Sequence, residues 1–160
     1  MCMEINKIEE LAKELMNAHM PELVKLGWKF KLDNARLRFG FCLYRRRTIS
    51  VSRYIASINE EKYVKQTIIH EIAHALVGSG NGHNAKWKDM AKSLGHNGSR
   101  TYSHAVVVPP KKWTIRCPKC GIAELRIRKT ERRFACKWCC DTYNKGKFSP
   151  EFVLMWERNN

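Results

Sequence analysis

The run His-Glu-Ile-Ala-His at residues 70–74 constrains the fold of this chain more strongly than any other feature. On a helix, His70 and His74 lie one turn apart on the same face, so both imidazoles can reach one metal ion. Glu71 lies beside them, where its carboxylate can act on a metal-bound water rather than on the metal. Two nitrogen ligands, a carboxylate base and an open coordination position are the minimal equipment of a zinc hydrolase. The run therefore predicts a helix that carries a catalytic zinc ion, with Glu71 as the general base.

The residues around this run favour a helix. Asn59 or Ser57 can cap its start, two glutamates follow in the first turn where they complement the helix dipole, and Gly78 can end it. Apolar residues recur at helical spacing and would form a buried stripe: Val64, Ile68, Ile72, Ala73 and Leu76. The alternative is an ordinary amphipathic helix with two incidental histidines. A buried glutamate between two histidines would then be costly, because neither a metal nor its water would pair with it.

A third metal ligand has to come from outside this helix. No glutamate follows the run before Glu124, which removes a common choice of zinc peptidases. The remaining candidates are Asp89, His83, His96 and His104. His83 follows the glycine-rich turn Gly-Ser-Gly-Asn-Gly, which lets the chain reverse beside the metal, and it precedes a short helix expected at residues 85–94. We therefore predict His83 as the third ligand, and we interpret His96 and His104 as solvated loop residues.

Two C-x-x-C pairs separated by fifteen residues predict a second metal site. Its ligands would be Cys117, Cys120, Cys136 and Cys139, with Cys140 as the alternative to Cys139, which the C-x-x-C geometry favours. Seven cysteines with this pairing indicate metal binding rather than disulfides in an intracellular chain. Residues 123–135, between the pairs, alternate as in a β-hairpin. The module has too little core to fold alone, so its zinc would be structural and closed to chemistry.

The net charge of +15 and the pI near 9.8 indicate a polyanionic partner. Residues 111–160 carry 13 Lys and Arg against 5 Asp and Glu, a net of +8, whereas residues 1–110 carry 17 against 10, a net of +7. Basic residues interleaved with aromatic ones suit single-stranded nucleic acid, whose phosphates they neutralise and whose bases they stack upon. The predicted contacts are Arg126, Arg128, Lys129, Arg132, Arg133, Lys137 and Trp138. The alternative is a solvated basic face whose aromatic residues, Phe134 among them, form the small core of the module.

The remaining pattern predicts an α+β fold in two domains, residues 1–110 and 111–160. An amphipathic helix begins near Ile5 and ends before Pro21. Strands are expected at residues 28–33, 36–45 and 48–54, with a last short one at 106–108 before two prolines. The apolar closing segment Phe-Val-Leu-Met-Trp-Glu is expected to dock on one of the two domains.

Nothing in the chain has the form of a membrane span or a secretory signal. No apolar run approaches the length of a bilayer-spanning helix, and the N-terminal residues lack the basic-then-apolar order of a signal peptide. We therefore expect an intracellular, cytoplasmic protein that does not bind membranes.

The segment HEIAHALVGSGNGHNAKWKDMAKSLG resembles the metalloprotease core of the SprT-like family, which includes the Spartan DNA–protein crosslink proteases. The positions that match the family pattern are His70, Glu71, His74, His83 and Trp87. Residues 27–55 resemble the small antiparallel sheet of the family, and the cysteine-rich module resembles its terminal zinc ribbon. The loop between the second and third histidines is short and rich in glycine beside the insertions of some relatives, which leaves the shape of the substrate cleft open.

The resemblance implies a zincin-like core, built from an N-terminal helix, a small antiparallel sheet and the metal-binding helix, followed by a four-cysteine zinc ribbon. It implies a zinc-dependent endopeptidase of DNA repair, a monomer that is stimulated by single-stranded or damaged DNA and cleaves proteins attached to that DNA. Two other functions stay open. One is a zinc-containing DNA-binding protein without activity, and the other is a metalloprotease that acts on free proteins.

Overall fold

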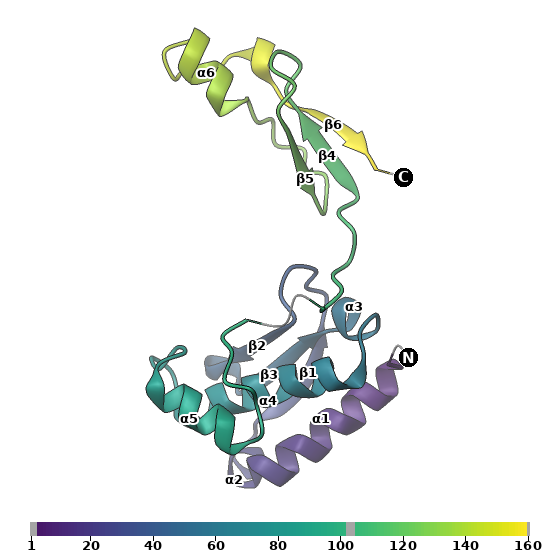
Figure 1. The fold of residues 1–160 in the computed structure, drawn as a ribbon, viewed down its shortest axis with the longest axis vertical. Coiled ribbons are helices and arrows are strands. Elements are labelled where there is room, and N and C mark those ends of the chain that lie inside the picture. The colour runs from purple at the N-terminus through teal and green to yellow at the C-terminus, as the bar shows by residue number, and fades with distance from the viewer. Residues whose placement is uncertain (1–2, 102–104, 160) are drawn as a thin grey trace. The chain divides into compact units, whose positions relative to one another are not determined.

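The computed structural model describes residues 3–101 and 105–159, which form two compact units, Met1–Pro109 and Pro110–Asn160 (Figure 1). The helices of the first unit are α1 (Ile5–His19), α2 (Pro21–Lys25), α3 (Arg53–Ala56), α4 (Glu61–Val77) and α5 (Ala85–Ser93). Its strands are β1 (Lys29–Asp33), β2 (Gly40–Leu43) and β3 (Thr48–Ser52), with a 3-10 turn, η1 (Tyr44–Arg46), between the last two. Helices and a small sheet in one unit give the α+β class that the sequence predicts.

The sheet has the order β1-β3-β2, with β2 antiparallel to β3 but β1 parallel to it. The prediction of a wholly antiparallel sheet is therefore wrong. The turn η1 folds β2 back onto one edge of β3, whereas β1, which ends at Asp33 as expected, pairs with the other edge. Asp33 ends β1, because its carboxylate accepts hydrogen bonds from the Ala35 amide at 2.8 Å and from the Ser50 hydroxyl at 2.9 Å. The alternation of apolar residues encodes which face is buried, not the direction of a strand.

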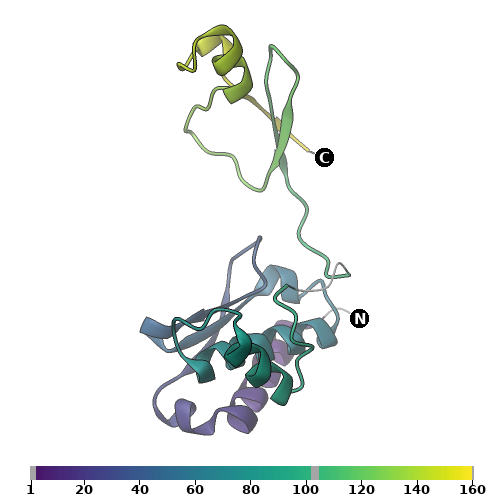
Figure 2. The same ribbon diagram turned by 60° about the vertical axis from the view of Figure 1, so that its left-hand side comes forward.

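The helix α4 forms the centre of the first unit, where it contacts α1, α5, β2 and β3 (Figure 1 and Figure 2). Four residues of the stripe expected from the sequence are fully buried, namely Val64, Ile68, Ile72 and Ala73, and the fifth, Leu76, is partly buried. Burying each of the larger side chains stabilises the fold by about 1.5–3 kcal/mol. The surrounding core includes Ile8, Met20, Ile49, Val51 and Ile55. No helix in the described part of the chain is long and apolar enough to span a membrane.

The capping predicted for this helix is wrong. Its N-cap is Glu60, whose side chain makes no capping hydrogen bond. The amide of Asn59 is instead turned away from the helix, where it donates to the Val107 carbonyl at 2.7 Å and accepts from the Val107 amide at 2.8 Å. The same two bonds explain why residues 106–108 form no strand, because a side chain takes the place of a strand partner.

The second unit contains a three-stranded antiparallel sheet of order β5-β4-β6 beside one helix. Its elements are β4 (Trp113–Arg116), β5 (Ala123–Arg126), α6 (Lys137–Tyr143), η2 (Pro150–Phe152) and β6 (Met155–Arg158). The closing segment thus docks on this unit, where β6 pairs with β4. The hairpin expected between the two cysteine pairs is wrong, because β5 pairs with β4 across the first pair. Residues 127–134, rich in like charges that repel, contribute no strand.

Candidate metal centre and cleft

Three histidine nitrogens meet at one point of the first unit. The Nε2 atom of His74 lies 3.2 Å from that of His70 and 3.2 Å from that of His83, and the remaining pair is 3.0 Å apart. Nitrogens that share a tetrahedral zinc ion at about 2.0–2.1 Å lie about 3.3–3.4 Å from one another. Each neutral ring carries a single N–H, so the three rings cannot satisfy one another by hydrogen bonding. The donor set and its spacing therefore fit zinc.

The third histidine is placed by two asparagines. Gly78 ends α4 in a conformation with φ 82°, and the Asn81 amide then donates to the Val77 carbonyl at 2.6 Å. Asn84 is the N-cap of α5, where its side-chain oxygen accepts from the Trp87 amide at 3.1 Å. His83 lies between these two caps, so the end of one helix and the start of the next fix its backbone.

The indole of Trp87 packs against all three rings. It is fully buried, and its ring centroid lies 4.6 Å from that of His70, 4.6 Å from that of His83 and 5.2 Å from the stacked His74 ring. Its Nε1 is buried without a hydrogen-bond partner among the described residues. Contact with all three rings holds them in one orientation, so Trp87 supports the metal-binding histidines from below.

Burial keeps the ligand histidines neutral. It lowers the pKa of His70 to about 3, with smaller effects of the neighbouring His74, His96 and His83, and it lowers the pKa of His74 to about 4. The pKa of His83 is lowered too, by burial first and then by the guanidinium of Arg100. Neutral imidazole is the form that binds a metal, so these rings are prepared for coordination at neutral pH.

Glu71 lies beside the three histidines and against the edge strand β2. Its side chain is 6% exposed, and burial raises the pKa of its carboxyl to about 8, although Arg38 opposes this. A Cβ atom at Gly40 would lie 2.6 Å from the Glu71 Oε1 and 2.8 Å from the Thr67 Cγ2. Only glycine leaves room for the carboxylate at this place, so Gly40 belongs to the site although no motif includes it.

Of this group, His70 and Glu71 line a cleft of about 420 Å³. Its walls are residues 37–40 at the start of β2, one face of α4, and the segment that follows α5. Arg100 is exposed on this last wall. His104, one of the candidates for the third metal ligand, lies outside the described residues. Asp89 is exposed on α5 and is not part of the histidine group.

The interpretation of His96 as a solvated loop residue is wrong. Its side chain is 8% exposed and lines the cleft, with its ring centroid 5.3 Å from that of His70. Gly95, with φ 84°, turns the chain back at the end of α5, and the His96 amide donates to the Ala91 carbonyl at 2.9 Å. A residue that follows a glycine at the end of a helix often packs back on that helix. Gly95 is therefore the feature of the sequence from which the burial of His96 could have been predicted.

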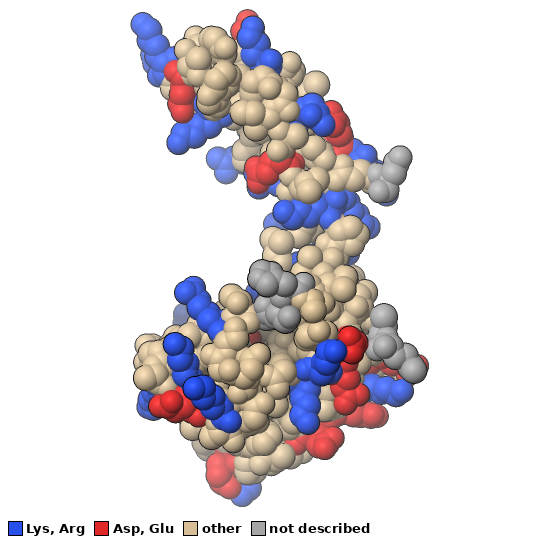
Figure 3. Space-filling model, in the orientation of Figure 1, with Lys and Arg blue, Asp and Glu red and all other residues tan. Residues whose placement is uncertain are grey.

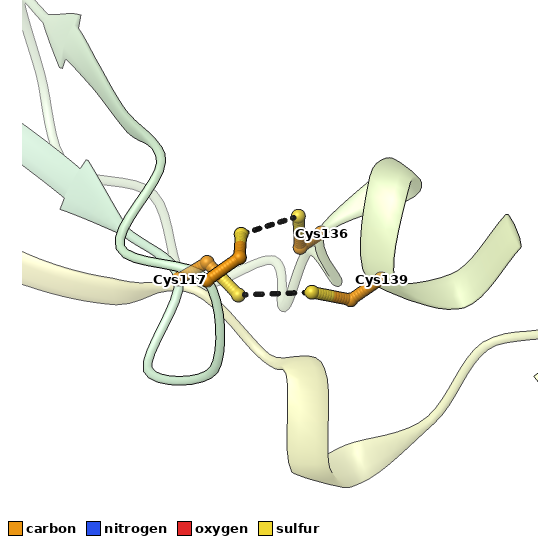
Figure 4. A group of neighbouring side chains, drawn as sticks. Cys117, Cys136 and Cys139 are labelled. Atoms are coloured by element: carbon orange, nitrogen blue, oxygen red, sulfur yellow. Dashed lines mark hydrogen bonds between the residues drawn. The ribbon is translucent and has the colours of Figure 1, made fainter. Parts of the chain in front are cut away.

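The four paired cysteines meet in the second unit (Figure 4). The Sγ atoms of Cys117 and Cys139 are 3.7 Å apart, as are those of Cys120 and Cys136. Sulfurs around a tetrahedral zinc ion at about 2.3 Å lie about 3.8 Å from one another, so this group also fits zinc. Cys140 is buried but lies outside the group.

The seven residues predicted to contact nucleic acid are all exposed. Figure 3 shows Lys and Arg side chains over the visible face of this unit, with acidic side chains between them. Trp138 is 50% exposed, and its ring meets that of Tyr143 edge to face at 5.9 Å. Phe134, interpreted as a core residue, is 36% exposed, and the Arg132 guanidinium lies 5.5 Å above its ring. Arg126 is engaged by Glu124 at 2.7 Å.

Comparison with known protein families gives a match to the first unit. The model of the SprT-like family matches residues 6–107, a span that includes the three histidines, Glu71 and the walls of the cleft. No curated protein matches the chain.

Proposed function

The chain belongs to the SprT-like family, and from this membership we propose that it is a zinc-dependent endopeptidase with a zincin-like core that acts on DNA-associated proteins. The family is related to metallopeptidases, which gives the general class of activity. The observation that carries the proposal is the triangle of Nε2 atoms, 3.0–3.2 Å apart, beside a buried glutamate in an open cleft. Three protein ligands leave one coordination position for the reaction, as catalytic zinc sites require.

His70, His74 and His83 would hold the catalytic zinc through neutral imidazoles. When bound, zinc supplies Lewis-acid chemistry, since it polarises the peptide carbonyl and lowers the pKa of water. The histidines contribute orientation, because Trp87 and the two helix caps restrict their rings before any metal arrives.

Glu71 would serve as the proton carrier. Its carboxylate oxygen accepts a proton from the water that attacks the carbonyl carbon, and a new C–O bond forms. The same oxygen then gives the proton to the amide nitrogen as the C–N bond breaks. Burial raises the pKa of Glu71 in the metal-free site, and the positive charge of a bound zinc ion would favour the carboxylate form that accepts the proton.

The ribbon would hold one structural zinc and bind DNA. Four thiolates close the coordination sphere and leave no position for chemistry. The exposed basic residues would neutralise phosphates, and the half-exposed Trp138 would stack on an unpaired base. Single-stranded or damaged DNA offers such bases, so we assign it as the partner that brings protein substrates to the cleft and stimulates cleavage.

The test is cleavage of a linker histone, and of the chain itself, with and without single-stranded DNA. The variant Glu71→Gln is expected to keep its zinc and lose at least about 10³-fold in turnover, because the proton carrier is removed. Glu61→Gln, on the exposed first turn of the same helix, is the matched control and is expected to cleave like the parent.

Each alternative function has its own outcome in this experiment. Cleavage that needs both DNA and Glu71 supports the proposal. Cleavage at the same rate without DNA would identify a protease of free proteins. A zinc-loaded preparation that binds DNA, with a steep loss of affinity in salt, but cleaves nothing would identify a non-catalytic DNA-binding protein.

A further inference from the structure

Peptide hydrolysis develops negative charge on the carbonyl oxygen, and an enzyme gains most from a donor already aimed at that oxygen. Such a donor has to line the cleft, be fixed in place, and carry an N–H or O–H that no protein acceptor uses. Lys62, whose ammonium pairs with the Glu60 carboxylate at 3.0 Å, is already engaged. Three other side chains of the cleft with basic nitrogen atoms, apart from the ligand His70, are compared by these criteria: Arg38, His96 and Arg100.

His96 is the most rigidly placed of the three. Its backbone amide is bound to the Ala91 carbonyl at 2.9 Å, and its side chain is 8% exposed. Its ring packs edge to face on His70, at a centroid distance of 5.3 Å, and on Trp87, at 5.7 Å. The ring is thus held beside a ligand histidine and at the wall of the cleft.

One hydrogen bond fixes where the proton of this ring lies. The Nδ1 atom of His96 accepts the Gly98 amide at 3.0 Å, so Nδ1 uses its lone pair and carries no hydrogen. A neutral imidazole has one N–H, which must then be on Nε2. No acceptor for Nε2 exists among the described residues, and this atom is not one of the buried polar atoms without a partner. The Nε2–H is therefore an accessible donor on a ring that lines the cleft.

The two arginines meet the criteria less well. The guanidinium of Arg38 is engaged by the Asp33 carboxylate at 2.8 Å and lies 4.7 Å above the Phe41 ring. Arg100 is exposed and makes no hydrogen bond or ion pair with another described residue. A long exposed side chain loses conformational entropy when it is ordered in the transition state, whereas the ring of His96 is already ordered.

We propose that His96 is a catalytic residue that donates a hydrogen bond from Nε2 to the carbonyl oxygen as that oxygen becomes negative. This rests on the proposed peptidase function. No proton is transferred in this role: the N–H remains on the ring, the water proton goes to Glu71, and the charge on oxygen disappears when the C–N bond breaks.

The experiment compares His96→Ala and His96→Gln with the parent, using a fluorescein-labelled linker histone and single-stranded DNA. His96→Ala is expected to lower kcat by about 10²–10³-fold with little change in KM, because the lost bond forms only in the transition state. His96→Gln retains a side-chain N–H and is expected to recover part of that loss. His19→Gln, at the end of α1, makes the same chemical change away from the cleft and should leave kcat unchanged.

Two readouts do not depend on turnover. Zinc content is expected to be the same in all variants, because His96 is not a ligand, whereas removal of the buried ring in His96→Ala should lower the chemical denaturation midpoint. Phosphoramidon, whose phosphoryl oxygens imitate the tetrahedral intermediate, should bind His96→Ala at least about tenfold more weakly than the parent in calorimetry.

The outcomes separate this inference from the function it rests on. If the parent chain cleaves and His96→Ala cleaves within threefold of it, the role of His96 is wrong and the peptidase function stands. If His96→Ala and His96→Gln lose zinc in proportion to activity, His96 acts on the metal centre instead, and the inference is again overturned. If the parent itself does not cleave, the failure belongs to the proposed function.

Discussion

The two candidate metal sites of this chain differ in how far the surrounding fold supports them. In the first unit, three histidines and Glu71 lie on a fold with an extensive apolar core. In the ribbon, the residues that the structure describes as buried are Ile115, Phe152 and four of its cysteines. The core of the first unit is therefore able to hold its site in shape before metal binds, whereas the ribbon depends on its metal for its shape. The number of ligands differs in the same way. Three histidines leave one coordination position open and rely on the fold to hold them, whereas four cysteines would enclose a metal ion that itself stabilises the fold.

The largest effect expected from this contrast is loss of the ribbon when a cysteine of the group is replaced. Cys139→Ser should release the ribbon zinc and unfold residues 110–160, because metal binding contributes on the order of 10 kcal/mol to such modules. Cys140→Ser, its buried neighbour outside the group, is the matched control and should keep the zinc. Amide NMR spectra of the full chain and zinc analysis report both. Collapse of the ribbon signals in Cys140→Ser alone would reverse the assignment of the ligand.

Replacing Trp87, which packs beneath the three histidines, should lower the stability of the first unit by less and should not unfold it. Trp87→Ala is expected to lower the free energy of unfolding by about 3–5 kcal/mol, since a large buried side chain leaves a cavity under three rings. Trp87→Phe should cost about 1–2 kcal/mol, because it keeps the ring stack and removes an indole N–H that has no partner among the described residues. Urea denaturation measures both values. Equal losses in the two variants would show that ring packing is not what supports the site.

A methyl group added at position 40 should reduce the catalytic rate far more than it reduces the stability of the first unit. Gly40→Ala places Cβ 2.6 Å from the Glu71 Oε1, so the carboxylate must move. We expect a loss of about 10²-fold in kcat, as for a misplaced catalytic group, with a cost of about 1–3 kcal/mol in stability. Adding Thr67→Ser removes the second close atom and should recover stability but not kcat. Recovery of both would show that Glu71 had not been displaced.

The smallest effect is expected for the stability of the first unit without metal, because its apolar core is expected to keep it folded. In the presence of a chelator, His74→Gln should unfold within about 1 kcal/mol of the parent's first unit, because glutamine fills most of the space of the ring and the core, not the metal, maintains that fold. The measurement is denaturation of both proteins without metal, followed by Trp fluorescence. If the parent's first unit loses its folded spectrum when zinc is removed, the two centres are alike and the comparison fails.

Local patterns in the sequence predict the helix with its buried stripe, both groups of metal-binding residues and the order of most elements. They predict these well because helical spacing and C-x-x-C spacing bring residues together within a few positions. The features that the patterns miss depend on distant partners. The side chain of Asn59 binds residue 107 instead of capping the helix that follows it. The strand β5 pairs with β4, which lies on the other side of the first cysteine pair in the sequence.

The same reason explains the errors within the site. His96 lies in a polar segment, and its burial depends on the turn at Gly95 that returns the chain toward the cleft. The parallel pairing of β1 with β3 depends on backbone hydrogen bonds between residues nineteen positions apart, such as Lys29 and Thr48. Neither hydrogen bonding nor chain reversal is visible in the alternation of apolar and polar residues.

The approach of Gly40 to Glu71 also says how such a site can be recognised in other sequences. The backbone at position 40 has no unusual φ, so the turn rules that normally explain a glycine do not apply to it. Its constraint comes from a carboxylate thirty-one positions later in the chain. A search pattern that pairs a strand glycine with the downstream His-Glu-x-x-His run would therefore select chains that can shelter the glutamate, and reject those in which the same five letters occur by chance.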